Sequence, residues 1–149
     1  MTRAFIGLGA NLGDRAATIR FAADLVGATR LSTLRETEPW GQADQPRFLN
    51  AVAEIETAES ARELLDRLLE AERRLGRVRD GERWGPRTID LDLLVFGDEE
   101  IDEPGLTVPH RYLHERLFVL EPLVELAPDL SVPGRGTVAE LLARIESPS

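Results

Sequence analysis

Hydrophobic positions recur with two periods along the chain, and these periods predict its strands and helices. Apolar residues at every second position predict a half-buried strand, whereas apolar residues three and four positions apart predict a helix with one buried side. We expect strands over residues 2–9, 30–37, 49–57 and 88–96, with a short return strand over 99–102. We expect helices over residues 14–27, 61–75 and 113–128, and a short C-terminal helix after residue 137.

Capping residues mark where the expected helices begin and end. The residues suited to these roles are Asp14, Ser60 and Thr137 at the beginnings, and Gly27 and Gly76 at the ends. Glu63 and Glu140 complete two capping boxes of the form S/T-x-x-E. Pro122 lies within the third expected helix, and because proline lacks an N–H group we expect it to bend or interrupt that helix.

The expected elements follow the order β-α-β-β-α-β, with a C-terminal helical extension. That order is typical of the ferredoxin-like α+β sandwich, which has an antiparallel sheet. With 149 residues the chain is long enough to bury a sizeable core, and we expect a single domain over residues 1–149. Two stretches that contain Gly and Pro, 38–48 and 77–87, predict long polar loops.

The composition narrows the range of partners. The formal net charge of −9 argues against a general binder of nucleic acid or of anionic membranes. No apolar segment approaches the length of a membrane span, and the first residues lack the pattern of a signal peptide. The chain has no cysteine, so disulfides and thiolate chemistry are excluded. We therefore expect a cytoplasmic protein.

One segment departs from the acidic character of the chain. Residues 73–87 carry a local net charge of +4, from Arg73, Arg74, Arg77, Arg79, Arg83 and Arg87 against Asp80 and Glu82. Every basic residue of the chain is Arg, so the clustering, and not the residue type, indicates a site for an anionic ligand. The chain has no lysine for a Walker A loop, and in "GLGANLGD" Leu12 replaces the last glycine of the dinucleotide-binding pattern.

Two aspartates stand one residue apart in the expected strand 88–96. Strand geometry places Asp90 and Asp92 on one face, about 6–7 Å apart, and places Ile89, Leu91, Leu93 and Val95 on the other. Two carboxylates on one face repel each other unless a positive group lies near them. Mg²⁺ is usually held by one or two carboxylates together with substrate phosphates and water. The residues alone leave two interpretations open: a solvent-facing strand, or a site for Mg²⁺ and a polyphosphate beside the arginine-rich loop.

Other candidate residues are ambiguous by themselves. Trp40 and Trp84 lie in the two expected loops, with Phe48 at the edge of one; they either anchor the loops or cover a flat ligand. Glu72 lies on the apolar side of its helix, where it either reaches water or contacts a ligand. His110 and His114 do not make a zinc site, because the chain has no third histidine and no cysteine.

Four segments resemble the 6-hydroxymethyl-7,8-dihydropterin pyrophosphokinase family in order and spacing. They are "AFIGLGANLGD", "ETEPWGQADQPRFLNAV", "GRVRDGERWGPRTIDLDLLVFGDEEI" and "LTVPHRYLHERLFVLEPLVELAP". The resemblance implies an enzyme of tetrahydrofolate synthesis that transfers the β,γ-pyrophosphoryl group of ATP to the hydroxymethyl oxygen of the pterin and releases AMP. It implies two Mg²⁺ ions that bridge the triphosphate and are bound by Asp90 and Asp92.

The resemblance also assigns the remaining site residues. Catalytic roles fall to Arg77, Arg87, Asp90 and Asp92. ATP contacts fall to Glu72, Arg77, Arg79, Trp84, Arg87, Leu93, Leu106, Thr107, His110 and Arg116. Pterin contacts fall to Thr37, Trp40, Phe48, Asn50, Trp84, Asp90 and Phe118.

The chain departs from the family pattern at three positions. Phe48 replaces a tyrosine found in many members, Arg111 stands where some relatives have an aromatic residue, and Asp80 puts an acid in the basic loop. The expected partners are ATP and the pterin, with no nucleic acid and no membrane, and we expect a monomer. A non-catalytic ligand-binding module of ferredoxin-like fold is the main alternative. An RNA-binding sheet is disfavoured by the acidic face of Asp90 and Asp92.

Overall fold

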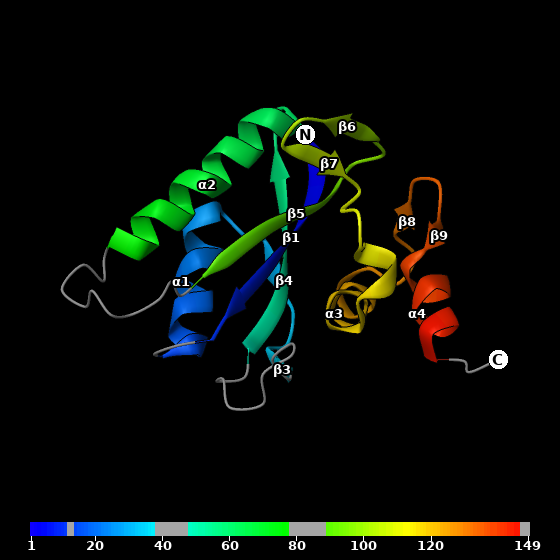
Figure 1. The fold of residues 1–149 in the computed structure, drawn as a ribbon, viewed down its shortest axis with the longest axis horizontal. Coiled ribbons are helices and arrows are strands. Elements are labelled where there is room, and N and C mark those ends of the chain that lie inside the picture. The colour runs from blue at the N-terminus through cyan, green and yellow to red at the C-terminus, as the bar shows by residue number, and fades with distance from the viewer. Residues whose placement is uncertain (12–13, 38–47, 78–88, 147–149) are drawn as a thin grey trace.

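A three-layer sandwich with a central antiparallel sheet forms the fold (Figure 1). The computed structural model describes residues 1–11, 14–37, 48–77 and 89–146, without the side chains of Gly76 and Arg77. Along the chain the elements are β1 (Thr2–Ala10), α1 (Arg15–Val26), β2 (Arg30–Leu31), β3 (Arg35–Thr37), β4 (Phe48–Thr57), α2 (Ala61–Arg77), β5 (Asp90–Phe96), β6 (Ile101–Glu103), β7 (Leu106–Val108), η1 (Leu113–Glu115), α3 (Leu117–Leu126), β8 (Ser131–Val132), β9 (Gly136–Thr137) and α4 (Val138–Glu146).

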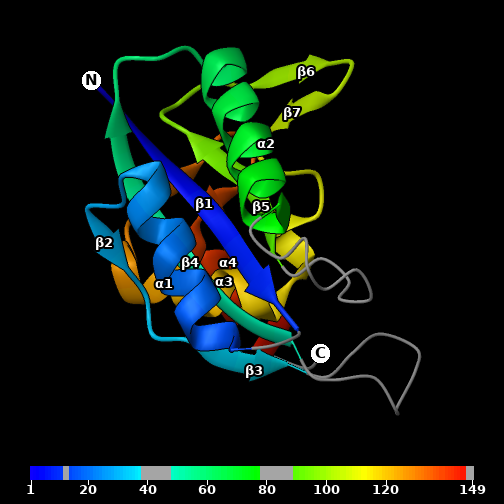
Figure 2. The same cartoon turned by 90° about the vertical axis from the view of Figure 1, so that its left-hand side faces the viewer.

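The main sheet has the strand order β2-β4-β1-β5, and β3 also pairs with β4. All of these pairings are antiparallel. The predicted ferredoxin-like α+β class is therefore confirmed. Helices α1 and α2 lie side by side over one face of the sheet, and Figure 2 shows them in front of β1. Helices α3 and α4 lie on the opposite side of the sheet (Figure 1).

The predicted caps hold the helix ends. Asp14 Oδ1 accepts a hydrogen bond from the Ala17 N–H at 3.1 Å, and Gly27 adopts the left-handed conformation, with φ of 82°. In both capping boxes, the side-chain oxygen of each residue accepts a hydrogen bond from the backbone N–H of the other residue, at 2.8 to 3.1 Å. Helix α2 continues through Gly76 and ends at Arg77, one residue beyond the predicted stop.

The predicted strand 30–37 is interrupted at Ser32. Its hydroxyl accepts the Val52 N–H at 2.9 Å, and the N–H of Thr33 donates to the Glu125 carboxylate of α3. These side-chain bonds take the place of regular strand pairing, so two short strands form where one was expected. The predicted loop 38–48 also ends one residue early, because Phe48 begins β4.

The predicted helix 113–128 is broken at Arg116 and not at Pro122. Arg116 has extended backbone angles, with φ of −114° and ψ of 106°, and separates η1 from α3. Pro122 is buried inside α3. A proline at this sixth helical position removes the hydrogen bond to the carbonyl of Phe118 and crowds that carbonyl, but α3 continues through it. A short hairpin of β8 and β9, which was not predicted, follows α3. The Val138 N–H after this hairpin donates to the Leu130 carbonyl before it.

A β-bulge in β5 overturns part of the predicted alternation. Ile6 pairs with Leu93 but Phe5 pairs with Val95, so Leu94 is an extra residue on β5. As a result Val95 turns to the opposite core from Leu91 and Leu93, although one face was expected for all three. The short return strand also differs: β6 spans 101–103 and pairs with β7, which was not predicted.

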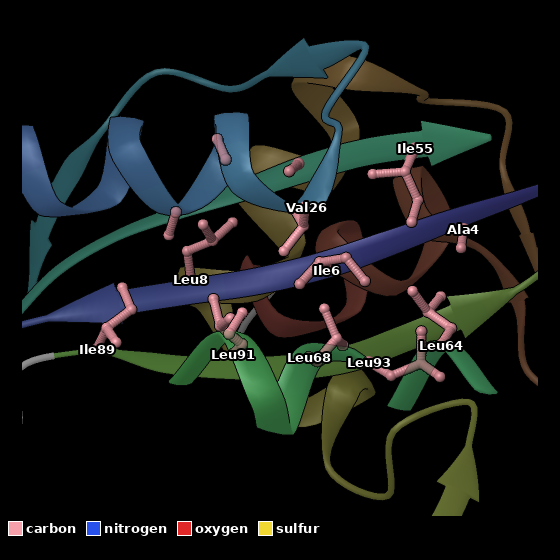
Figure 3. Packing of buried hydrophobic residues seen from close by; sticks show 14 of the residues in the cluster. Ala4, Ile6, Leu8, Val26, Ile55, Leu64, Leu68, Ile89, Leu91 and Leu93 are labelled. Carbon is pink, nitrogen blue, oxygen red and sulfur yellow. The ribbon is translucent and has the colours of Figure 1, made fainter. Parts of the chain in front are cut away.

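Two hydrophobic cores lie on the two faces of the sheet. The first core packs β1, β4 and β5 against α1 and α2, and Figure 3 shows Ile6, Leu91 and Leu68 meeting in it. The second core packs α3 and α4 against the other face, through Phe5, Val52 and Leu94 among others. No helix in the described ranges has the length and apolar character needed to cross a bilayer.

We predict that Leu120→Ala will lower the free energy of unfolding by about 2 to 5 kcal/mol, because the side chain is fully buried in the second core and its removal leaves a cavity. Leu117→Ala, on the same helix at 39% exposure, is the matched control and should cost less than half as much. Urea denaturation measures both. Equal losses would show that α3 is not packed as described.

Candidate active site

A cavity of about 390 Å³ opens on the second face of the sheet, beside the start of α3. It lies next to the second core, where that core no longer covers the sheet. The lining residues are Gly7, Leu8, Gly9, Thr37, Phe48, Asn50, Ala51, Val52, Asp90, Asp92, Leu94, Arg116, Phe118 and Val119. The cavity thus joins a carboxylate end on β5 to an aromatic and amide end on β3, β4 and α3.

Two glycines of β1 form the floor of the cavity. Gly7 pairs with Asp92 on one side and with Val52 on the other, and Gly9 likewise pairs with Asp90 and Asn50. Directly paired residues share a face of the sheet, so the aspartates and the β4 residues flank a strip without side chains. A Cβ atom added to Gly9 would lie 3.1 Å from Asn50 Oδ1. A side chain there would press on the amide and fill the floor.

The amide of Asn50 is oriented by a neighbouring strand. Its Nδ2 group donates a hydrogen bond to Thr37 Oγ1 at 2.7 Å, which leaves Oδ1 on the side of Gly9. Asn50 is 9% exposed, so the amide is held at the cavity wall. Phe48, opposite Thr37 on β4, adds an aromatic surface beside it. An amide with fixed polarity next to a flat ring suits a planar heterocycle.

Glu72 connects α2 to the strand that carries the aspartates. The Leu91 N–H donates to Glu72 Oε2 at 2.7 Å, so the carboxylate bonds the backbone of β5 between Asp90 and Asp92. Burial raises the pKa of Glu72 above its ordinary value; the Leu91 N–H opposes that shift, and the two aspartates add to it. The sequence left Glu72 open between water and a ligand. Its hydrogen bond to the strand is a third role that the pattern did not disclose.

His110 is also linked to the strand that carries the acid pair. The backbone N–H of His110 donates to the carbonyl of Leu94 at 2.8 Å. This bond ties the chain at His110 to the bulge residue of β5. The Tyr112 N–H donates to His110 Nδ1 at 3.2 Å, which leaves the ring proton on Nε2 when the imidazole is neutral. Burial lowers the pKa of His110, Asp92 opposes this shift, and Arg116 and Arg111 add to it. The neutral ring can therefore donate from Nε2.

The predicted site residues fall into three groups. Those that line the cavity are Thr37, Phe48, Asn50, Asp90, Asp92, Arg116 and Phe118. Those placed elsewhere are Glu72 and His110, linked to β5 by hydrogen bonds, Leu93 and Leu106 in the first core, and half-buried Thr107 on β7. Trp40, Arg79, Asp80, Trp84 and Arg87, and the Arg77 side chain, lie outside the described residues.

The sequence patterns missed the glycine floor. "GLG" in residues 7–9 matches neither the dinucleotide-binding pattern nor a Walker A loop. The alternation of β1 carries the signal: Ala4, Ile6 and Leu8 fill the first core, so Gly7 and Gly9 must face the opposite side. Two glycines on the face opposite a buried run indicate a close approach by a ligand or another backbone.

The exposed carboxylates of Asp90 and Asp92 are a donor set that suits a magnesium ion. Both are oxygen donors on one face of β5 and both line the cavity. Within the described part of the chain, no group of three or more His, Cys, Asp or Glu residues could hold a metal ion. Two carboxylates completed by phosphate and water oxygens match the way Mg²⁺ is usually bound with a nucleotide.

We predict that His110→Gln will remove part of the pH dependence of stability. Because folding lowers the pKa of His110 below its ordinary value of about 6.5, the unfolded chain binds more protons between those two values. Wild-type stability should therefore fall as the pH drops below about 6.5, and this penalty is absent near pH 8, where the ring is neutral in both states. Denaturation of both proteins between pH 8 and pH 5 should show the wild type losing stability relative to the variant. Parallel curves would contradict it.

Comparison with known proteins agrees with this geometry. Residues 5–128 match the family model described as 7,8-dihydro-6-hydroxymethylpterin-pyrophosphokinase. The 2-amino-4-hydroxy-6-hydroxymethyldihydropteridine pyrophosphokinase of Methylorubrum extorquens is 45% identical, over 98% of this chain and 95% of that protein. The protein of the same name from Pseudomonas aeruginosa is 47% identical, over 95% of this chain and 90% of that protein.

Two further relatives place the domain in longer chains. The folate synthesis bifunctional protein of Arabidopsis thaliana is 44% identical, over 81% of this chain and 26% of that protein. A crystal structure of Plasmodium falciparum HPPK-DHPS, with pterin and p-hydrobenzoate, superimposes with a TM-score of 0.75 at 16% identity. The superposition covers 97% of this chain and 42% of the Plasmodium chain. At this low identity it shows similarity of fold alone. With the family model and these relatives in agreement, the chain belongs to the 7,8-dihydro-6-hydroxymethylpterin-pyrophosphokinase family, enzymes that transfer pyrophosphate from ATP in folate synthesis.

Proposed function

We propose that the cavity between the sheet and α3 is where this chain transfers pyrophosphate from ATP to the hydroxymethyl group of 6-hydroxymethyl-7,8-dihydropterin. The observation that carries the proposal is the chemistry of its two ends. Two exposed carboxylates lie at one end, and an oriented amide with two phenylalanines lies at the other. A flat heterocycle and a metal-bound polyphosphate can thus meet over the same glycine floor.

The pterin is assigned to the Phe48 end. Phe48 and Phe118 both line this end, and they offer ring faces for stacking. Asn50 Oδ1 can accept a hydrogen bond from an N–H group of the pterin, because its Nδ2 group is already bound to Thr37. The absence of a tyrosine hydroxyl at Phe48 leaves stacking intact. Trp40 and Trp84 stay proposed contacts of the same ring.

The polyphosphate is assigned to the carboxylate end. Asp90 and Asp92 would hold Mg²⁺ there, and we propose two ions with ATP. Such ions neutralise charge on the phosphates and activate the attacking hydroxyl when they are bound. Arg116 lines the cavity and is the described cation that faces this ligand. His110 would donate from Nε2, and Arg77, Arg79 and Arg87 are proposed phosphate contacts.

The other nucleotide contacts are proposed with a narrower role. Leu93 and Leu106 are each 5% exposed in the first core, so only their edges are open to an adenine ring. Thr107 pairs with Asp102 at the edge hairpin, where it could contact the base from β7. Glu72 acts on the site through Leu91, in addition to any contact with ATP. We further propose that residues 1–149 form a single domain and that the protein is a cytoplasmic monomer. Light scattering measures whether it is a monomer.

Positioning carries most of the proposed chemistry. The transfer needs an in-line approach of the hydroxymethyl oxygen, neutralised phosphate charge and exclusion of water. The side chains described supply orientation and charge. No strong general base stands out among the described lining residues, since Asp90 and Asp92 are committed to the metal.

The activity test incubates the protein with ATP, Mg²⁺ and 6-hydroxymethyl-7,8-dihydropterin. We expect AMP and the pterin pyrophosphate in equal amounts, and no AMP when the pterin is left out. Chromatography of nucleotides and pterins measures both products. ADP as the product would refute pyrophosphoryl transfer, and ligand binding without turnover would favour the non-catalytic module.

We predict that Asp92→Asn will lower turnover by more than the roughly 10- to 100-fold that loss of an outer-shell partner of a metal costs. The fold should persist, because the Asp92 side chain is exposed. Asp98→Asn is the matched control: it removes the same charge from an exposed position in the turn after β5 and should change turnover by less than about twofold. Initial rates and thermal melts of both variants decide. If Asp92→Asn kept the wild-type rate, the proposal that Asp92 binds the metal would be wrong.

A further inference from the structure

The guanidinium of Arg116 lies close to two aromatic rings. Its central carbon is 5.4 Å from the ring centre of Tyr112 and 5.6 Å from that of Phe118. Both distances fall within the range of attraction between a cation and a ring face. Within the described residues the Arg116 side chain makes no ion pair, so these two rings are its close partners there.

The two rings differ in what else they do. Phe118 lines the cavity and is assigned to the pterin. Tyr112 is 44% exposed and is not among the residues that line the cavity. Its position is nevertheless fixed. Leu113, the next residue, is fully buried, and the Tyr112 N–H is bonded to His110 Nδ1.

The backbone between Tyr112 and Arg116 is also tied down. The Glu115 N–H donates to the Tyr112 carbonyl at 3.0 Å, and the Arg116 N–H donates to the Leu113 carbonyl at 3.3 Å. This single turn of 3₁₀ helix sets the spacing that brings the tyrosine ring onto the guanidinium. Tyr112 therefore touches Arg116 through its ring and His110 through its backbone. Both of these residues are assigned to the triphosphate.

We propose that Tyr112 is a positioning residue that holds the Arg116 guanidinium at the phosphate end of the cavity. This inference rests on the proposed function. A free arginine side chain samples many rotamers, and ordering it on binding weakens affinity. Contact with the exposed Tyr112 ring and with the cavity-lining Phe118 ring restricts those rotamers before ATP binds. The contact with Arg116 is made by the ring of Tyr112 and not by its hydroxyl, so a phenylalanine at position 112 should position Arg116 equally well.

The structure separates this role from simple surface packing. A ring that only covers the surface would influence the stability of the fold and nothing specific to a ligand. A positioning ring influences ATP binding through Arg116 and leaves the pterin contacts of Asn50 and Thr37 unchanged, since those lie on β4 and β3. The two roles therefore predict different responses of the two substrates.

The test compares Tyr112→Leu with Tyr112→Phe, using calorimetry with Mg²⁺ and a non-hydrolysable ATP analogue. Tyr112→Leu should weaken binding of the analogue by about threefold to tenfold, which is the range for the cost of ordering one long side chain on binding. Tyr112→Phe should stay within about twofold of the wild type. The KM for the pterin should change less than the affinity for the analogue in both variants.

Two further proteins make the result specific. In an Arg116→Met background, Tyr112→Leu should have no additional effect on the analogue, because the partner of the ring is already gone. Phe21→Leu, a similar change at an exposed aromatic residue of α1, is the control and should bind like the wild type. Thermal melts confirm that each variant is folded.

The outcomes are distinct. Equal binding by wild type, Tyr112→Leu and Tyr112→Phe would overturn the inference, and so would an effect of Tyr112→Leu that persists without Arg116. In both cases AMP formation by the wild type would leave the proposed function standing. A wild type that neither binds the analogue nor forms AMP would overturn the proposed function and this inference together.

Discussion

Strand β1 buries a side chain at each alternate position toward α1 and α2, but toward α3 a phenylalanine is followed by two glycines. Phe5 gives α3 and α4 a surface to pack on. Gly7 and Gly9 have no side chains for these helices to pack on, so the second core ends there and the cavity begins. Asp90, Asp92 and Asn50 border this strip, Thr37 lies beyond β4 on β3, and Arg116 and Phe118 line the cavity from the beginning of α3. The first core lies on the opposite face of the sheet and stabilises the sheet independently of the cavity.

The acid-bearing strand depends on contacts along its outer edge. Strand β5 lies at the end of the main sheet, with β1 on one side only. On the other side Glu72 bonds the Leu91 N–H, and the Leu94 carbonyl bonds His110. These two bonds come from α2 and from the segment before η1. They place a carboxylate and an imidazole beside the acid pair without adding a strand.

Local patterns sufficed for much of this arrangement. The alternation of β1 and β4, the two capping boxes and the acid pair on β5 are each contained in a few neighbouring residues, and the structure has them where predicted. The order of elements and the resemblance of four segments were enough for the fold and the family. The individual site assignments stay proposals.

The departures have long-range causes. The break at Ser32 needs Val52 and Glu125, which are distant in sequence. The bulge at Leu94 depends on the pairing of β5 with β1. Nothing close to Glu72 in the sequence shows that its carboxylate reaches the backbone of β5. Such contacts are set by tertiary packing, which a pattern of neighbours does not contain.

The acid pair has a consequence for the stability of the fold. Asp90, Asp92 and Glu72 bring three carboxylates to one stretch of strand, and the two aspartates make it harder for Glu72 to ionise. That repulsion opposes folding, and Mg²⁺ bound at Asp90 and Asp92 as proposed would offset part of it. Under that proposal, Mg²⁺ and ATP would stabilise the folded chain and slow its degradation by proteases.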